Sequence, residues 1–141
     1  MEAEVLEHER PVELIVVHAS DTPPSMDIGV REIRKWHLDR GWNDIGYHYV
    51  IRRNGETETG RDESEVGAHA YGYNARSIGI CLVGGGDGKV DYTAAQWDTL
   101  KSLVMRLKQK YERYHCRVCG HCDLDEKKTC PNFNVKAWAG G

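Results

Sequence analysis

The segment 92–114 constrains the fold more than any other part of the chain, because it specifies a long amphipathic helix. Thr93 and Gln96 have the spacing of a capping box, which satisfies free backbone amides at a helix start. Tyr92 and Trp97 have the spacing of the hydrophobic staple that often accompanies such a start. The apolar positions that follow share one helical face and are Trp97, Leu100, Leu103, Val104, Leu107, Tyr111 and Tyr114. This periodicity predicts a helix whose apolar face is buried in the core.

Short runs, several of them rich in β-branched residues, predict the strands that this helix would cover. They are Glu13–His18, Tyr47–Arg53, Glu56–Arg61, Ser77–Val83 and Cys116–Gly120. The second and third runs flank Asn54-Gly55, a pair typical of hairpin turns. Because strands alternate with amphipathic helices, we predict an α/β domain with a central mixed sheet flanked by helices. The pattern leaves the strand order open.

Two shorter helical segments complete the expected elements. Apolar spacing predicts a helix from Val30 to about Arg40, where Gly41 would stop it, and a short helical turn at Val135–Trp138. The chain has 141 residues and no linker divides it, so we predict one domain at 12–141 after a polar lead-in at 1–11.

Composition argues against two classes of function. The longest apolar run has four residues, Leu14–Val17, whereas a membrane span needs about 20. The net charge of −3 makes sequence-independent nucleic-acid binding a poor expectation, since such binding neutralises phosphates with basic residues. The first residues are acidic and lack an apolar stretch, so we expect no Sec-type signal peptide and synthesis in the cytoplasm.

Three residues could together ligate a metal ion. His18 ends a predicted buried strand, and His121 directly follows another. Cys130 precedes Pro131, which favours an extended backbone at the residue before it. Two imidazoles and one thiolate satisfy Zn²⁺ and leave a fourth tetrahedral position for water, as in catalytic zinc sites. Spacing alone equally allows a buried strand-end histidine and a buried thiol with no metal.

A closed structural zinc site competes for the same residues. The chain has five cysteines, an odd number, so at least one thiol is unpaired or bound to a metal. Cys116 and Cys119 form a Cys-x2-Cys pair that His121, Cys122 and Cys130 could complete. However, no second pair follows at the usual spacing of about 15–20 residues, and the first pair would face opposite sides of a strand. A disulfide from Cys116 to Cys119 or Cys122 is also open.

Three further residues matter if the metal is catalytic. Lys128 precedes Cys130 by two positions, so an extended segment would direct both side chains to one face, where the ammonium could stabilise an oxyanion. Tyr47 opens the predicted hairpin and could hold an attacking water or donate a proton. His69 lies in a loop of small residues that a ligand could approach. Each also has an ordinary interpretation, as a solvated lysine, a strand tyrosine and a loop histidine.

Several stretches of the sequence are more specific when they are taken together, in their order along the chain, than any one spacing is alone. They are IVVHASDT at 15–22, VREIRKWH at 30–37, GWNDIGYHY at 41–49, GRD at 60–62, VGAH at 66–69, GYN at 72–74, SIGICLVGG at 77–85, GH at 120–121 and KTCPNF at 128–133. In this order, over residues 12–138, the chain resembles the zinc-dependent N-acetylmuramoyl-L-alanine amidases, whose relatives include phage lysozymes of the T7 type and peptidoglycan recognition proteins.

The resemblance implies a mixed sheet flanked by helices, with one Zn²⁺ in a surface groove. The site residues that it implies are the zinc ligands His18, His121 and Cys130, the catalytic residues Tyr47 and Lys128, and the substrate-binding His69. It implies as substrate the peptidoglycan amide that joins the lactyl group of N-acetylmuramic acid to L-alanine of the stem peptide. Cys116, Cys119, Cys122 and the acidic run 123–126 depart from the family pattern.

We therefore expect a peptidoglycan hydrolase, made by a phage or prophage, that acts on the cell wall after release. Its expected partner is the muropeptide substrate, with no nucleic acid and no membrane, and we expect it to act as a monomer. The alternative is a module that binds peptidoglycan fragments without cleaving them.

Overall fold

The predicted strands form one five-stranded sheet. It consists of β1 (Leu14–Ala19), β2 (Tyr49–Ile51), β3 (Thr57–Thr59), β4 (Ser77–Leu82) and β5 (Arg117–Gly120), in the order β3-β2-β4-β1-β5. Only β3 is antiparallel to its neighbour, so the predicted mixed sheet is confirmed. The structure, a computed structural model, describes residues 10–140. Most of the predicted lead-in, residues 1–9, lies outside the described residues.

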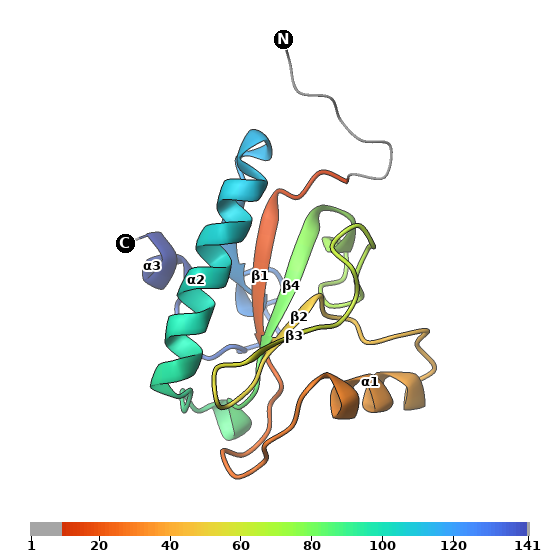
Figure 1. Ribbon diagram of the computed structural model, residues 1–141, viewed down its shortest axis with the longest axis vertical. Coiled ribbons are helices and arrows are strands. Elements are labelled where there is room, and N and C mark those ends of the chain that lie inside the picture. The colour runs from red at the N-terminus through yellow and green to blue at the C-terminus, as the bar shows by residue number, and fades with distance from the viewer. Residues whose placement is uncertain (1–9, 141) are drawn as a thin grey trace.

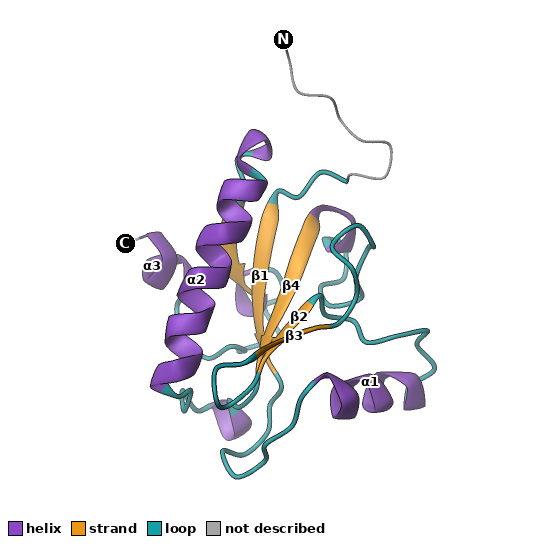
Figure 2. Ribbon diagram, in the orientation of Figure 1, coloured by secondary structure: helices purple, strands orange, loops and turns teal. Residues whose placement is uncertain are grey.

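Helices lie on both sides of this sheet (Figure 1). α2 (Ala94–Lys110) and the short α3 (Val135–Gly140) pack on one face, where Trp97 and Trp138 approach within 6.3 Å between ring centroids. α1 (Val30–Asp39) packs on the other face (Figure 2). Single-turn 3₁₀ helices fill connections in the described residues, at Asn74–Arg76, Gly86–Gly88, Glu112–Tyr114 and His121–Asp123. No helix among the described residues is long and apolar enough to span a bilayer.

Alternation along β1 gives the two faces of the sheet different partners. Ile15, Val17 and Ala19 belong to the core beneath α2, together with Ile78, Ile80 and Leu82 of β4. Since successive strand residues point to opposite faces, Val16 and His18 face the α1 side. A smaller apolar cluster under α1 ends near that histidine, and its members are Ile28, Val30, Ile33, Ile45, Val50, Cys81 and Val83.

The start of α2 follows the predicted capping pattern. Thr93 Oγ1 accepts from the amide of Gln96 at 3.1 Å, and Gln96 Oε1 accepts from the amide of Thr93 at 2.9 Å. The helix ends at Lys110, earlier than the apolar periodicity predicts, because Tyr111 leaves helical geometry. The chain then makes a 3₁₀ turn and passes through a left-handed His115 before it enters β5.

The predicted hairpin is confirmed with shorter strands and a longer loop. The backbone amide of Arg52 donates to Glu56 O at 2.9 Å, so the loop between these residues has three residues. An Asn-Gly pair such as Asn54-Gly55 is more typical of a two-residue loop. Gly55 has φ +89°, the left-handed conformation that closes a three-residue loop of this kind.

Candidate metal centre

Parallel pairing of β1 with β5 brings two histidines together. Val17 of β1 is in register with Gly120 of β5. The residues that follow these two, His18 and His121, therefore lie at the carboxyl end of the parallel pair. Their ring centroids lie 4.5 Å apart. The sheet topology thus explains how residues far apart in the sequence reach one place.

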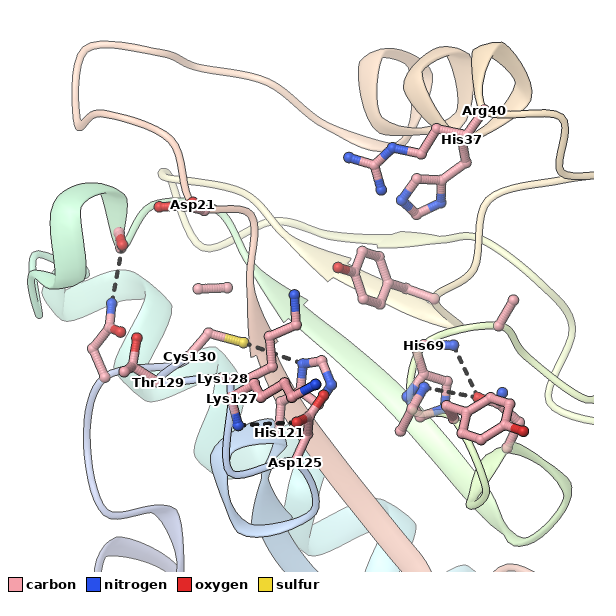
Figure 3. A pocket seen from close by; sticks show the side chains of 18 of the residues that line it. Asp21, His37, Arg40, His69, His121, Asp125, Lys127, Lys128, Thr129 and Cys130 are labelled. Carbon is pink, nitrogen blue, oxygen red and sulfur yellow. Dashed lines mark hydrogen bonds between the residues drawn. The ribbon is translucent and has the colours of Figure 1, made fainter.

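Cys130 completes the group from the loop between β5 and α3. The amide of Cys122 donates to Cys130 O at 2.9 Å, which holds this loop against the turn at His121. Cys130 Sγ lies 3.5 Å from His121 Nδ1, as the dashed line in Figure 3 shows. The ligating atoms of His18, His121 and Cys130 all lie within 4.8 Å of one another. Ligands of a tetrahedral zinc ion lie roughly 3–4 Å apart, so a small closure would complete such a site.

The other cysteines do not enter this group. Among residues 10–140, one group of three or more histidine, cysteine or acidic side chains has its ligating atoms this close together, and its members are His18, His121 and Cys130. Cys116 is buried in the core beneath α2, and burial raises the pKa of its thiol to about 11. All five cysteines lie in the described part and are free thiols, so the structure contains neither the disulfide nor the closed four-ligand site.

Electrostatics keeps the two imidazoles in the form that binds metals. Burial lowers the pKa of His18 well below its ordinary value, and the neighbouring His69 and His121 lower it further. Burial and the Lys128 ammonium also lower the pKa of His121. Burial raises the pKa of the Cys130 thiol, but coordination deprotonates such a thiol outright. The donor set therefore fits a zinc ion.

A cavity of about 770 Å³ opens beside this group and is lined by His121 and Cys130. The loop that carries His121, Lys128 and Cys130 lines one side, and the end of α1 with His37 and Arg40 lines the other (Figure 3). This volume is typical of a small-molecule or cofactor site.

Tyr47 and Lys128 both line this cavity, as an active-site role would require. The Tyr47 ring lies 5.1 Å from the His18 ring, centroid to centroid. Burial raises the pKa of the Tyr47 phenol well above its ordinary value, so the phenol stays protonated at neutral pH. Lys128 follows a turn in which its amide donates to Asp125 O at 2.9 Å.

His69 lies next to His18 and lines the cavity. It is 9% exposed, and its Nδ1 lies 2.8 Å from His18 Nε2 while its Nε2 lies 3.1 Å from Ser77 Oγ. Burial lowers the pKa of His69 to about 3, so its ring is neutral. A direct contact between His69 and substrate stays a prediction, since both ring nitrogens already have partners within the protein.

Sequence reasoning assigned no role to three other residues of the cavity wall. His37 Nδ1 accepts from the amide of Gly46 at 2.9 Å, and its ring lies 4.4 Å from that of Trp42. The Arg40 guanidinium lies 5.9 Å from the Trp42 ring. His37 and Trp42 lie in stretches that carry the resemblance, and Arg40 lies at the end of a predicted helix, where a cation is ordinary because it complements the helix dipole.

Fold and site together define a class of protein. A mixed sheet presents two imidazoles and one thiol at its edge, beside an open cavity that also holds a lysine and a tyrosine. Three protein ligands with space for a fourth are typical of catalytic metal sites in α/β enzymes.

Known proteins place the chain within this class. The family model of N-acetylmuramoyl-L-alanine amidase matches residues 8–133. The endolysin of Enterobacteria phage T3 is 52% identical over 130 residues, which are 89% of this chain and 84% of that protein. The endolysin of Escherichia phage T7 is 52% identical over 128 residues, which are 88% of this chain and 83% of that protein. The solved structure of N-acetylmuramoyl-L-alanine amidase LysC from Clostridium intestinale URNW has a TM-score of 0.79 and 32% identity, and the match covers 96% of this chain and 87% of that one.

The chain belongs to the N-acetylmuramoyl-L-alanine amidase family. It is a peptidoglycan amidase of the phage lysis type, so the family, the fold and the general function expected from the resemblance are confirmed.

Proposed function

We propose that this amidase depends on zinc and that His18, His121 and Cys130 hold one ion. The observation that carries the proposal is the convergence of these three ligating atoms within 4.8 Å beside the cavity. When bound, Zn²⁺ supplies a Lewis acid that activates water and polarises the scissile carbonyl. The bond cleaved is the amide between the lactyl group of N-acetylmuramic acid and L-alanine of the stem peptide.

Lys128 binds the developing oxyanion in this proposal. Its ammonium belongs to the same loop as Cys130 and lines the same cavity. A fixed positive charge stabilises a tetrahedral oxyanion more than the neutral carbonyl before it, and the effect grows where water is excluded. Lys128 therefore acts on the transition state and leaves the metal ligands unchanged.

Tyr47 orients the attacking water or transfers a proton. Its phenol lies on the cavity wall and stays protonated, so it can donate a hydrogen bond to an oxygen near His18. We propose that the chain acts as a monomer, because the candidate ligands, Tyr47 and Lys128 form a site that requires no residue from a second copy. The phage endolysins to which the chain is similar support action on the cell wall after release from the cytoplasm.

Metal analysis of the purified protein, combined with mass spectrometry of digested peptidoglycan, tests the proposal. We expect one zinc per chain and release of stem peptides that begin with L-alanine, both abolished by a chelator and restored by added zinc. Binding of peptidoglycan without release of peptide would instead establish a non-catalytic module. Unfolding on chelation would indicate a structural metal.

Two variants separate the roles of the residues. Lys128→Ala should retain zinc and lose about 100-fold or more in kcat, as removal of one oxyanion-stabilising group does. Tyr47→Phe should also retain zinc, with a smaller loss. Loss of zinc in Lys128→Ala would show that this lysine maintains the ligand geometry instead.

A further inference from the structure

At the candidate metal centre, three side chains form a continuous hydrogen-bonded chain that begins at the candidate ligand His18. His18 Nε2 lies 2.8 Å from His69 Nδ1, and His69 Nε2 lies 3.1 Å from Ser77 Oγ. His18 is 1% exposed, His69 is 9% exposed and Ser77 is fully buried. Because water has so little access to these side chains, the three ring nitrogens in this chain depend on their protein partners for hydrogen bonding.

The direction of the protons along this chain decides whether His18 can bind a metal. A neutral imidazole carries one proton, and only the other nitrogen has a free lone pair. Nε2 of His18 is engaged with His69, so Nδ1 is the nitrogen left for a metal. Nδ1 has its lone pair free only when Nε2 carries the proton and donates it to His69 Nδ1. His69 must then carry its own proton on Nε2 and donate it to Ser77 Oγ.

The surrounding backbone is shaped to hold the His69 ring in this position. A Cβ atom on Gly79 of β4 would lie 2.6 Å from His69 Cγ, and one on Gly67 would lie 2.8 Å from His69 Cδ2. Both distances are shorter than real contacts, so these glycines leave the space that the ring fills. Asn74 Oδ1 accepts from the backbone amides of His69 and Ala70, each at 2.9 Å, and so anchors the loop.

We propose that His69 is a positioning residue that, with Ser77, holds His18 in the tautomer whose Nδ1 binds the metal. The inference rests on the proposed zinc function and gives His69 a part different from substrate binding. A partner at the second nitrogen fixes the tautomer and the ring orientation of a ligating histidine, and loss of such a partner typically costs 10–100-fold in metal affinity or activity. Ser77 acts through His69, as the acceptor that fixes the His69 tautomer.

Two amide substitutions of His69 form a matched pair. In His69→Asn, the side-chain oxygen is as many bonds from the backbone as Nδ1 and can still accept from His18. In His69→Gln, the amide group matches Nε2 in bond count, so it reaches Ser77 and leaves His18 without its acceptor. The experiment measures the zinc dissociation constant of the full chain by competition with a chromophoric chelator.

The expected order of zinc affinity is wild type, then His69→Asn, then His69→Gln. We expect His69→Asn to bind zinc within about fivefold of wild type and His69→Gln to bind roughly 10–100-fold more weakly. Gln is closer to His in size than Asn is, so a merely space-filling role predicts the reverse order. Equal affinities or the reverse order would overturn the proposal.

The proton positions can be observed directly in the wild-type protein. Long-range ¹⁵N–¹H correlation spectra of the zinc-loaded chain should place the protons of both His18 and His69 on Nε2. A proton on Nδ1 of His69 would overturn the proposal even if the variants failed to fold. Wild-type chain that binds no zinc would refute the proposed function itself, whereas zinc-binding wild type with unaffected His69→Gln would refute only the role of His69.

Discussion

Both faces of the sheet bury apolar side chains, but the α1 face also buries a cluster of imidazoles. On the α2 face, Ile15 and Val17 are fully buried in an apolar core that packing alone holds together. On the α1 face, the next residue along the strand, His18, is equally buried but belongs to a cluster of imidazoles. In that cluster, Nδ1 of His48 accepts from the amide of Gly79 at 3.0 Å, and Nε2 of His48 lies 2.8 Å from Glu65 O.

The difference teaches what each face demands of its residues. Apolar side chains contribute through the area they remove from water, roughly 1.5–3 kcal/mol each, and volume-conserving exchanges are tolerated. A buried imidazole costs free energy unless specific partners meet both of its nitrogens. We therefore expect substitutions in the core beneath α2 to change stability alone, and substitutions at the metal centre on the other side to change activity.

The largest effect is expected from a pair of cysteines, Cys130 in the candidate metal centre and Cys116 in the core beneath α2. Cys130→Ser should lose zinc together with about 1,000-fold or more in activity, because a metal supplies several kcal/mol of transition-state stabilisation. Cys116→Ser, in the core beneath α2, should retain zinc and activity and lower the free energy of unfolding. Zinc analysis, peptide release and urea unfolding of both variants check this. Loss of zinc in Cys116→Ser would contradict the separation of the metal centre from the core.

Leu100→Ala sharpens the comparison from the α2 side. Leu100 is fully buried, so the substitution should lower the free energy of unfolding by about 2–5 kcal/mol through lost burial and a cavity. Below its unfolding temperature the variant should retain the wild-type kcat. Met105, 62% exposed on the same helix, supplies the control, and Met105→Ala should change stability by less than about 0.5 kcal/mol.

Acid should act through the α1 face. Burial lowers the pKa of His48 to about 4, against about 6.5 in the unfolded chain. Between these values the unfolded chain binds more protons, so the stabilisation is complete above about pH 6.5 and is lost as the pH falls towards 4. The slope for this residue is up to about 1.4 kcal/mol per pH unit.

Urea unfolding with chelator, between about pH 7 and about pH 5, measures that slope. His48→Asn retains an acceptor for the amide of Gly79 and removes the titration, so its unfolding free energy should depend less steeply on pH. An unchanged slope would show that other groups cause the acid sensitivity.

The smallest effect is expected at the start of α2. Thr93→Ala removes the oxygen that accepts from the amide of Gln96 and should lower the free energy of unfolding by about 1 kcal/mol. Zinc content and kcat should not change. Ser102→Ala, at an exposed position within the same helix, is the matched control and should be nearly neutral.

The elements that could be predicted from the sequence are those encoded by neighbouring residues. The capping pair Thr93 and Gln96 and the apolar period after them determine α2 locally, and Asn54-Gly55 marks the hairpin. The strand order could not be predicted in this way. That β5 lies beside β1 follows from how the whole chain packs, and no local pattern in either strand records it.

The candidate site divides in the same manner. His18, His121 and Cys130 were recognisable together as possible ligands of one ion, but their spacing is not specific. The family resemblance favoured this set over a closed site or no metal. Ser77 and Asn74 lie in stretches that carry the resemblance, but no pattern indicated their contacts with His69. A serine that opens a strand and an asparagine in a loop are ordinary in sequence, and only their place around His69 distinguishes them.

Gly79 has a consequence for how proteins of this architecture can vary. Because even a methyl group there would collide with the His69 ring, a library of all twenty amino acids at this position should yield glycine alone among active clones. Mutational scanning would then flag a residue that has no functional group, lies in mid-strand and needs no unusual backbone angle. The absence of a side chain at Gly79 is therefore itself a requirement of the reactive centre.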